Sequence, residues 1–373
     1  MSISAVDTIS LAFQHTRRQL IEPFRFWQWT RLAFVGLLAG EMGSGGCNVP
    51  TNFNFPHQTG NSRHLLNAGL GSIDPSTINP SSVDLSSIDP AVYAGLIAVL
   101  VVAGLVFAII MMYVSSVMRF ILFDSVLAKE CHIRQGWSRR RSPGWRYFLF
   151  QLGYMLATLA GMVVLLGIPA AFAFAMGWFH PPGEHVAALV LSGIVVFFLL
   201  FVFFVIAAVV HVLTKDFVVP QMALEGIGVV EAWRRLWPML EAERGGYAVY
   251  VLMKIVLAIG AGIVIGIASV ILGLIVAIPT VGLALIAVFT GEHAGLTWNA
   301  FTITIAVVVG CILFAVFFYL IALISVPAIV FFPAYAIYFF APRYRALSLV
   351  LYPPPPASGF DTGGLPAAPL PTA

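Results

Sequence analysis

The sequence predicts an all-α, polytopic integral membrane protein with about six transmembrane helices, arranged as three parallel hairpin repeats with interfacial amphipathic helices. Hydrophobic residues make up 60% of the chain and charged residues only 9%, and the mean hydropathy is +0.96. A soluble domain of 373 residues could not bury so much apolar surface. Long uncharged runs occur in pairs, with most Lys and Arg residues between the pairs, which predicts hairpins returning to one side.

Residues 1–23 are predicted to form an N-terminal interfacial helix, at about 4–22. Its apolar residues recur on one helical face, whereas Arg17 and Arg18 lie off that face. Pro23 follows, and the aromatic residues after it are typical of the lipid headgroup level.

The first membrane hairpin is expected at 24–146, and its first span is the least regular. Only nine uncharged residues separate Arg31 from Glu41, too few to cross a hydrocarbon core of roughly 30 Å. A span over 24–46 therefore requires Arg31 to snorkel and Glu41 to reach the far interface. The second span is predicted at about 92–114.

The outer loop of this hairpin, 47–91, is polar and carries a period-five repeat. Four pentads, SIDPS, TINPS, SVDLS and SIDPA, start at Ser72, Thr77, Ser82 and Ser87. Asp-Pro and Asn-Pro steps favour turns over helix, so a loop or a small docking surface is expected. The three cysteines are too widely spaced for a metal motif or a disulfide framework.

A basic cytoplasmic segment is predicted from about 115 to 146. Asp124 in this segment could pair with Arg119. Three consecutive arginines, together with a second arginine pair further on, are candidates for contacts with lipid headgroups: Arg139, Arg140, Arg141, Arg234 and Arg235.

The second hairpin and its amphipathic segment are expected at 147–246, with spans starting near Tyr147 and covering about 187–213. From Val229 onward, apolar residues recur at helical spacing, and Glu231 is placed to pair with either following arginine. Pro238 should end or kink this helix. The helix could lie in the membrane interface, pack on the ends of the membrane helices, or do both.

The third hairpin is expected at 247–345. Its first run, from Tyr247 to Thr290, is too long for one span, so we expect a break near Pro279. The last span is predicted at about 299–325. The tail, 346–373, is rich in Pro and is predicted to be disordered.

Internal matches support the repeat. Pro169 matches Pro279 and precedes Gly-Glu-His as Pro279 does, and a weaker copy aligns Arg119 with Lys215. The predicted inner segments hold 17 of the 19 Lys and Arg residues, so both termini are expected in the cytoplasm. The expected location is the cell (inner) membrane, with several spans.

The candidate functional residues are few. Glu184, His185, Glu292 and His293 are expected on the outer face, where a helix dipole explains the Glu residues and a shared metal site is the alternative. Lys254 is an intramembrane cation that could snorkel or pair with Asp216. His211 is read as an interfacial histidine. No catalytic, nucleotide-binding or metalloprotease motif occurs, so neither an enzyme nor a cofactor is expected.

The segment VPQMALEGIGVVEAWRRLWPML supports a resemblance to a known family. The matching features are Pro220, the ALEG sequence at 223–226, Glu231-Ala232 and Arg234-Arg235. The segment resembles the membrane domain associated with bacterial glycerophosphoryl diester phosphodiesterases, and related uncharacterised multi-span families. The resemblance implies a fold and not that activity, which belongs to a soluble domain that this sequence lacks.

Together these features predict a non-enzymatic membrane protein of the cell envelope that binds membrane lipids or a partner protein, and no nucleic acid. A transporter built from three parallel two-helix repeats is the alternative. An intramembrane enzyme acting on lipid is a third hypothesis, and it would need Lys254, His211 or the outer Glu-His pairs to converge on one pocket.

Overall fold

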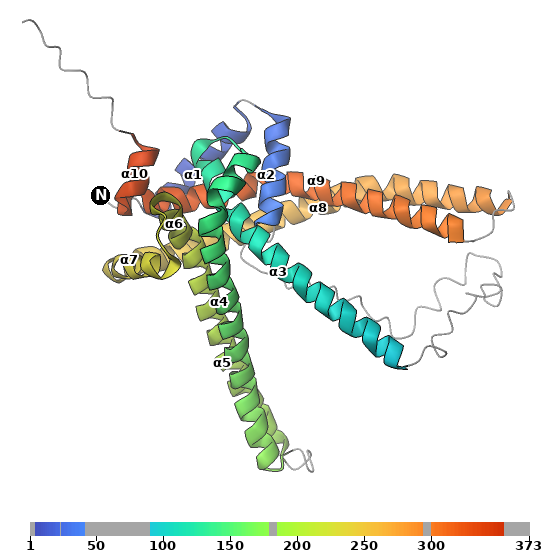
Figure 1. Ribbon diagram of the computed structural model, residues 1–373, viewed down its shortest axis with the longest axis horizontal. Coiled ribbons are helices and arrows are strands. Elements are labelled where there is room, and N and C mark those ends of the chain that lie inside the picture. Colours follow the sequence, from blue (N-terminus) through green and yellow to red (C-terminus); the bar gives the residue numbers. More distant parts are fainter. Residues whose placement is uncertain (1–3, 23, 42–89, 179–184, 294–299, 354–373) are drawn as a thin grey trace, which may run out of the picture. The chain divides into compact units, whose positions relative to one another are not determined.

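The computed structural model describes residues 4–22, 24–41, 90–178, 185–293 and 300–353, and these are helical with no strand among them (Figure 1). The chain divides into two compact units. One comprises residues 47–112, and the other comprises the rest. Of the smaller unit, the structure describes the first part of α3, whose large apolar side chains are exposed.

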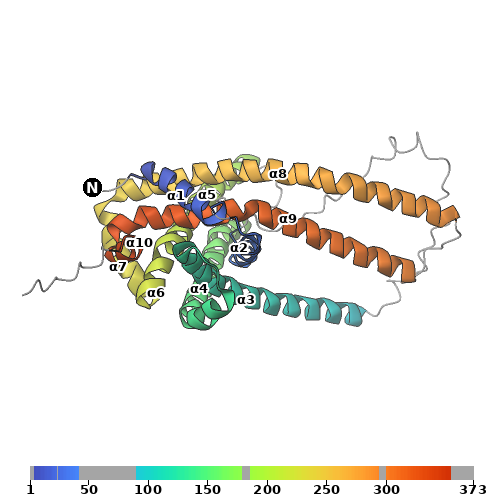
Figure 2. The same ribbon diagram turned by 90° about the horizontal axis from the view of Figure 1, so that it is seen from above.

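Five described helices are long and apolar enough to cross a membrane. They are α3 (Pro90–Ala128), α4 (Ile133–Ala175), α5 (Val186–Leu213), α8 (Arg244–His293) and α9 (Ala300–Phe340). Within the larger unit, α4 packs beside α5 and α8 beside α9, as the predicted hairpins require (Figures 1 and 2). Large apolar side chains point outward along these pairs; Phe174, Phe197 and Ile278 are each more than 70% exposed.

Two predicted helix breaks are absent. α8 continues through Pro279 to His293 as one helix, and α7 (Val229–Ala242) continues through Pro238. In α8, proline removes one backbone hydrogen bond, but an apolar run in hydrocarbon has no water to satisfy an opened backbone, so this helix continues.

The first predicted span is also different. α2 (Phe26–Leu38) has 13 residues, a length of about 20 Å, shorter than the roughly 30 Å of hydrocarbon. Gly40 then adopts a left-handed conformation (φ 75°), and Glu41 is buried against Lys215. Glu41 therefore does not reach toward a far interface, and the six-span arrangement stays a prediction.

The N-terminal helix α1 (Asp7–Leu20) lies within the range predicted for it, and both α1 and α2 pack on α9. The Tyr335 hydroxyl donates to the Ala5 carbonyl at 3.1 Å, and Trp29 Nε1 donates to the Leu20 carbonyl at 2.9 Å. Gly36 of α2 lies against Ile329 of α9 so closely that a Cβ there would come within 2.5 Å of it.

Short helices follow α5 and α9. A π-helical turn, Thr214–Val218, continues α5 into α6 (Val219–Glu225), and α10 (Arg345–Leu351) follows α9. The prediction of a disordered tail over 346–373 is therefore wrong for its first residues, which form α10 with Leu347 buried, and residues 354–373 lie outside the described residues. α6 ends because Gly226 adopts the left-handed conformation (φ 69°) that favours glycine at a helix C-terminus.

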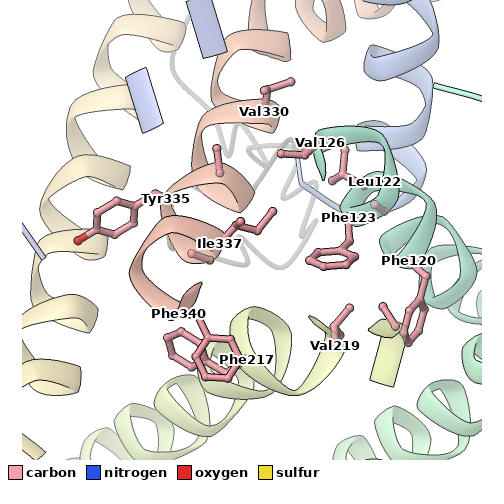
Figure 3. Close-up of a cluster of buried hydrophobic side chains, with 14 of the residues drawn as sticks. Phe120, Leu122, Phe123, Val126, Phe217, Val219, Val330, Tyr335, Ile337 and Phe340 are labelled. Atoms are coloured by element: carbon pink, nitrogen blue, oxygen red, sulfur yellow. The ribbon is translucent and has the colours of Figure 1, made fainter. Parts of the chain in front are cut away.

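The hydrophobic core forms where helix ends meet, rather than along the apolar middles of the long helices. Many of its members come from the C-terminal part of α3, the π-helical turn, α6 and the C-terminal part of α9, and others come from α1, α2, α7 and the start of α8. Figure 3 shows Phe120, Leu122, Phe123, Val126, Phe217, Val219, Val330, Tyr335, Ile337 and Phe340 of this cluster.

Candidate functional site: charges at the helix ends

A group of charged side chains lies inside this core. Lys215 Nζ is 2.5 Å from Glu41 Oε2, and the Glu41 side chain is almost fully buried. The neighbouring residue, Asp216, accepts hydrogen bonds from Lys254 and, at 2.8 Å, from the Tyr250 hydroxyl. Lys215 and Asp216 both lie in the π-helical turn, a rare form that is frequent at functional sites.

Arg119 of α3 completes this group. Its guanidinium donates to the Tyr147 hydroxyl and, at 3.3 Å, to the Ala39 carbonyl, and it stands 5.5 Å from the centre of the Tyr147 ring. Its Nε is buried without a hydrogen-bond partner. The hydrogen bonds of the guanidinium therefore go to neutral groups, and its Nε donor has no acceptor.

These side chains line a partly open cavity of about 30 Å³. All five charged residues, Glu41, Arg119, Lys215, Asp216 and Lys254, contribute to its wall, and the rest of the wall is mostly apolar. We call this group the charge cluster. Such a cavity has room for one or two waters.

The charge cluster lies at one end of the spans. Residues 92–118, 186–214 and 255–291 contain no Asp, Glu, Lys or Arg, so Arg119, Lys215 and Lys254 each border a long uncharged run. About 20 helical residues cross a bilayer, and each of these runs is longer than that. Lys254 is paired with Asp216, which is one of the two arrangements predicted for this lysine.

Sequence reasoning missed the convergence of Glu41, Arg119 and Lys215. The signal that could have found it was the repeat, which aligned Arg119 with Lys215 at the same place after an apolar run. Glu41 carried no such signal, because it follows a helix that was expected to span.

A second polar network joins α3, α4 and α6. Arg140 binds Asp124 through two hydrogen bonds of 2.6 and 2.7 Å and donates to the Ala223 carbonyl at 2.6 Å. The predicted pairing of Asp124 with Arg119 is wrong, because Arg119 lies inward on Tyr147. Two hydrogen bonds between an arginine and a carboxylate fix the relative orientation of the two side chains and are stronger than bonds between neutral groups.

The ALEG and EA-RR features of the sequence serve this same packing. Glu225 binds both Arg235 and the Tyr344 hydroxyl, and Glu231 binds both Arg234 and Arg235, as expected. Burial and the Glu225 hydrogen bond raise the pKa of Tyr344. These contacts therefore connect the end of α6 to α7 and to Tyr344, the residue before α10.

The arginines proposed to contact lipid headgroups fall into two groups. Arg140, Arg234 and Arg235 are each bound to a carboxylate. Arg139 and Arg141 are exposed on α4, and neither forms an ion pair within the described part of the chain.

Arg141 lines a shallow pocket of about 360 Å³ together with Tyr113, Ser142, Trp145 and Arg146. Trp145 is half exposed, and its ring packs edge-on to Tyr113 at 5.6 Å. We call this group the Arg-Trp pocket. It presents cations, a hydroxyl and aromatic faces at the point where the apolar run of α4 begins.

His15 of α1 is buried between two helices. Its Nε2 lies 3.0 Å from the Val126 carbonyl and its Nδ1 lies 3.1 Å from the Tyr338 hydroxyl. Burial lowers the pKa of His15, so the neutral ring is favoured.

Of the four outer-face candidates, the structure describes the side chain of His185 alone, so it describes no contact among them. His185 precedes α5 and is half-buried, whereas Glu184 and the side chains of Glu292 and His293 lie outside the described residues. No group of three metal-ligating side chains occurs among the residues described. His211 stacks on Tyr154 with ring centres 6.4 Å apart.

Five long helices with exposed apolar flanks define this chain as a multi-pass membrane protein. It belongs to a family of unknown function (DUF7544), whose model matches residues 3–350, a range that includes almost every described helix. No curated protein and no solved structure matches the chain.

Proposed function

We propose that this chain is a non-enzymatic membrane protein of the cell envelope that binds anionic lipid and supports a membrane complex. The observation that carries the proposal is the Arg-Trp pocket. It combines Arg141 with a half-exposed Trp145 at the boundary of an apolar span. Arginine near a membrane surface is attracted to lipid phosphate, and tryptophan favours the headgroup level.

Exposed apolar side chains on the short helices extend this surface. Val230 and Trp237 of α7 are exposed, while Val229 and Leu236 of the same helix are buried in the core. One helix can thus pack on the ends of the spans and still reach the interface. Phe13 of α1 and Phe24 after it are likewise more than 60% exposed. These exposed side chains support an interfacial role for α1 and α7.

The distribution of charge supports an inward orientation of these surfaces. Arg139, Arg141, Arg234 and Arg345 all border the same ends of the spans as the charge cluster. The positive-inside rule places that side, and with it both termini, in the cytoplasm, where anionic lipid is enriched. A protease-protection assay of a C-terminal tag on right-side-out vesicles tests this; external cleavage contradicts it.

Native mass spectrometry from nanodiscs of phosphatidylglycerol and phosphatidylcholine tests lipid binding. The double variant R139Q/R141Q should retain about 25-fold less phosphatidylglycerol, since each cation near the surface contributes about 1 kcal/mol. The variant R17Q/R345Q is the matched control, because it removes the same charge from exposed arginines outside the Arg-Trp pocket and so measures the general attraction of basic side chains to anionic lipid. Equal retention in the two variants contradicts the lipid proposal.

The transporter alternative has one supporting observation, the charged cavity between the spans. Its volume of about 30 Å³ has no room for an organic solute, so this alternative is confined to small inorganic ions. Ion flux into proteoliposomes, measured against empty vesicles, separates the two functions. Flux that R139Q/R141Q leaves unchanged would favour transport.

Kinship with the membrane domain of the phosphodiesterases remains a proposal about fold. Gly226 and Glu225 have structural roles here, in ending α6 and in binding Arg235 and Tyr344. These roles explain how the motif could recur without a shared activity. A structure of that domain lacking the same turn would contradict kinship.

A further inference from the structure

We propose that the cavity in the charge cluster binds a small monatomic anion of the halide class. This inference is independent of lipid binding, because it concerns the buried side chains of the charge cluster rather than the exposed arginines. Four observations support it: the charge of the walls, the partners of each charge, the size of the cavity, and its surroundings.

The walls carry an excess of positive charge. Arg119, Lys215 and Lys254 face two carboxylates, Glu41 and Asp216, which leaves one positive charge among the described residues of the cluster. An uncompensated charge in an apolar interior is costly, and removing that imbalance stabilises the fold. An anion inside the cavity supplies the missing negative charge.

The partners show which cation lacks a carboxylate. Lys215 is bound to Glu41, and Lys254 is bound to Asp216. Arg119 has only the Tyr147 hydroxyl and the Ala39 carbonyl as hydrogen-bond acceptors, and its buried Nε has no acceptor. A guanidinium with a free donor therefore lies on the wall of a cavity whose charged residues carry one excess positive charge.

The size and surroundings of the cavity limit the ligand. A volume of about 30 Å³ accommodates one or two waters or a single halide ion, and excludes organic carboxylates. Phe123, Val219 and Phe332 are among the apolar residues of the wall. Their low polarity strengthens the attraction between a bound anion and the cations.

Thermal unfolding of the full-length protein in detergent tests the proposal. Chloride or bromide is titrated against gluconate at constant ionic strength, so that only the identity of the anion changes. The Tm should rise along a saturating curve, by about 3 °C at a halide concentration ten times the dissociation constant. The same Tm in halide and in gluconate overturns the proposal.

Two variants change the charge balance in opposite directions. Lys215→Met removes the excess positive charge and should abolish the halide effect. Glu41→Gln doubles the excess, so this variant should unfold at a lower Tm in gluconate and show a larger rise in halide than the wild type. A merely structural loss lowers the Tm equally in both salts.

If Lys215→Met does not fold, Glu41→Gln still decides the matter. Equal Tm values for Glu41→Gln in bromide and gluconate would mean that a neutral lysine, rather than an anion, balances the cluster. Anomalous diffraction from crystals grown in bromide provides the direct measurement. A bromide peak beside Arg119 supports the proposal, and a cavity without bromide contradicts it.

Discussion

The ends of the long helices and their apolar middles differ in how closely they pack. At the ends, Gly36 and Gly144 are pressed against Ile329 and Val117, with an added Cβ only 2.5 and 2.7 Å from those side chains. Along the middles, Gly153 and Gly266 have no neighbouring atom within 4 Å of such a Cβ. Close packing is therefore concentrated at the ends, and Gly161 of α4, where an added Cβ would lie 2.7 Å from Phe203 of α5, is an exception within the spans.

The difference reflects two solvents. Hydrocarbon chains are as apolar as leucine, so an apolar flank gains little by leaving lipid, and helix association there depends on van der Waals packing and polar contacts. At the ends the helices approach water, where burying apolar side chains is favourable. The charge cluster is buried in this second region, and the exposed phenylalanines lie in the first.

Breaking an ion pair inside the core should have the largest effect. Asp216→Asn leaves Lys254 without a carboxylate, and loss of one partner of a buried pair costs about 3–5 kcal/mol. Glu231→Gln is the control, because its partners Arg234 and Arg235 are exposed or half-exposed. Such a surface pair contributes only about 0–1 kcal/mol.

Chemical unfolding of both variants in gluconate, without halide, measures this difference. The unfolding midpoint of Asp216→Asn should fall far below that of Glu231→Gln. Similar midpoints for the two variants would show that the charge cluster is hydrated rather than buried.

Two glycines of α4 provide the next comparison. Gly144→Ala places a methyl group 2.7 Å from Val117 Cγ2 and 3.2 Å from its Cα, and such overpacking costs about 1–3 kcal/mol. Gly153→Ala, in the same helix, meets nothing within 4 Å and should gain up to about 1 kcal/mol from helix propensity. Tm values of the two variants should therefore move in opposite directions from the wild type.

A smaller effect is expected at the turn after α6. Gly226 has φ 69°, a conformation that costs an L-residue about 1–2 kcal/mol, whereas Gly228 has φ −76° and extended backbone. Gly226→Ala should lower the Tm and Gly228→Ala should not. The same loss of Tm at both positions would mean that the turn tolerates other conformations.

Sequence patterns predicted most of the spans, because a long charge-free run in lipid forms a helix that satisfies its own backbone hydrogen bonds. The runs before Arg119 and Lys215 both correspond to described helices. The errors occur where tertiary contacts decide. Glu41 is drawn to Lys215 over a distance of 174 residues in sequence, and the break at Pro279 is suppressed because a continuous helix satisfies the neighbouring backbone.

The candidate sites also divide into contacts that the sequence suggested and contacts that depend on tertiary packing. Pairing with Asp216 was one of two arrangements predicted for Lys254, the other being snorkelling to the interface, and the structure has the pair. The selection of Arg140 by Asp124, and not of Arg119, depends on which faces of α3 and α4 meet. That is a property of packing, which no local pattern specifies.

The smallest expected effect is a pH dependence that arises in the core region. Burial lowers the pKa of His15 below the unfolded value of 6.5. Below about pH 6.5 the unfolded chain binds a proton that the folded ring resists, so stability is complete above that pH and declines as the pH falls toward the folded pKa. His15→Gln can keep a hydrogen bond to the Val126 carbonyl but cannot titrate. Its Tm should therefore change less than that of the wild type between pH 7 and pH 5. Parallel pH profiles of the two proteins would show that His15 is accessible to water, and that the packed region at the helix ends opens around α1.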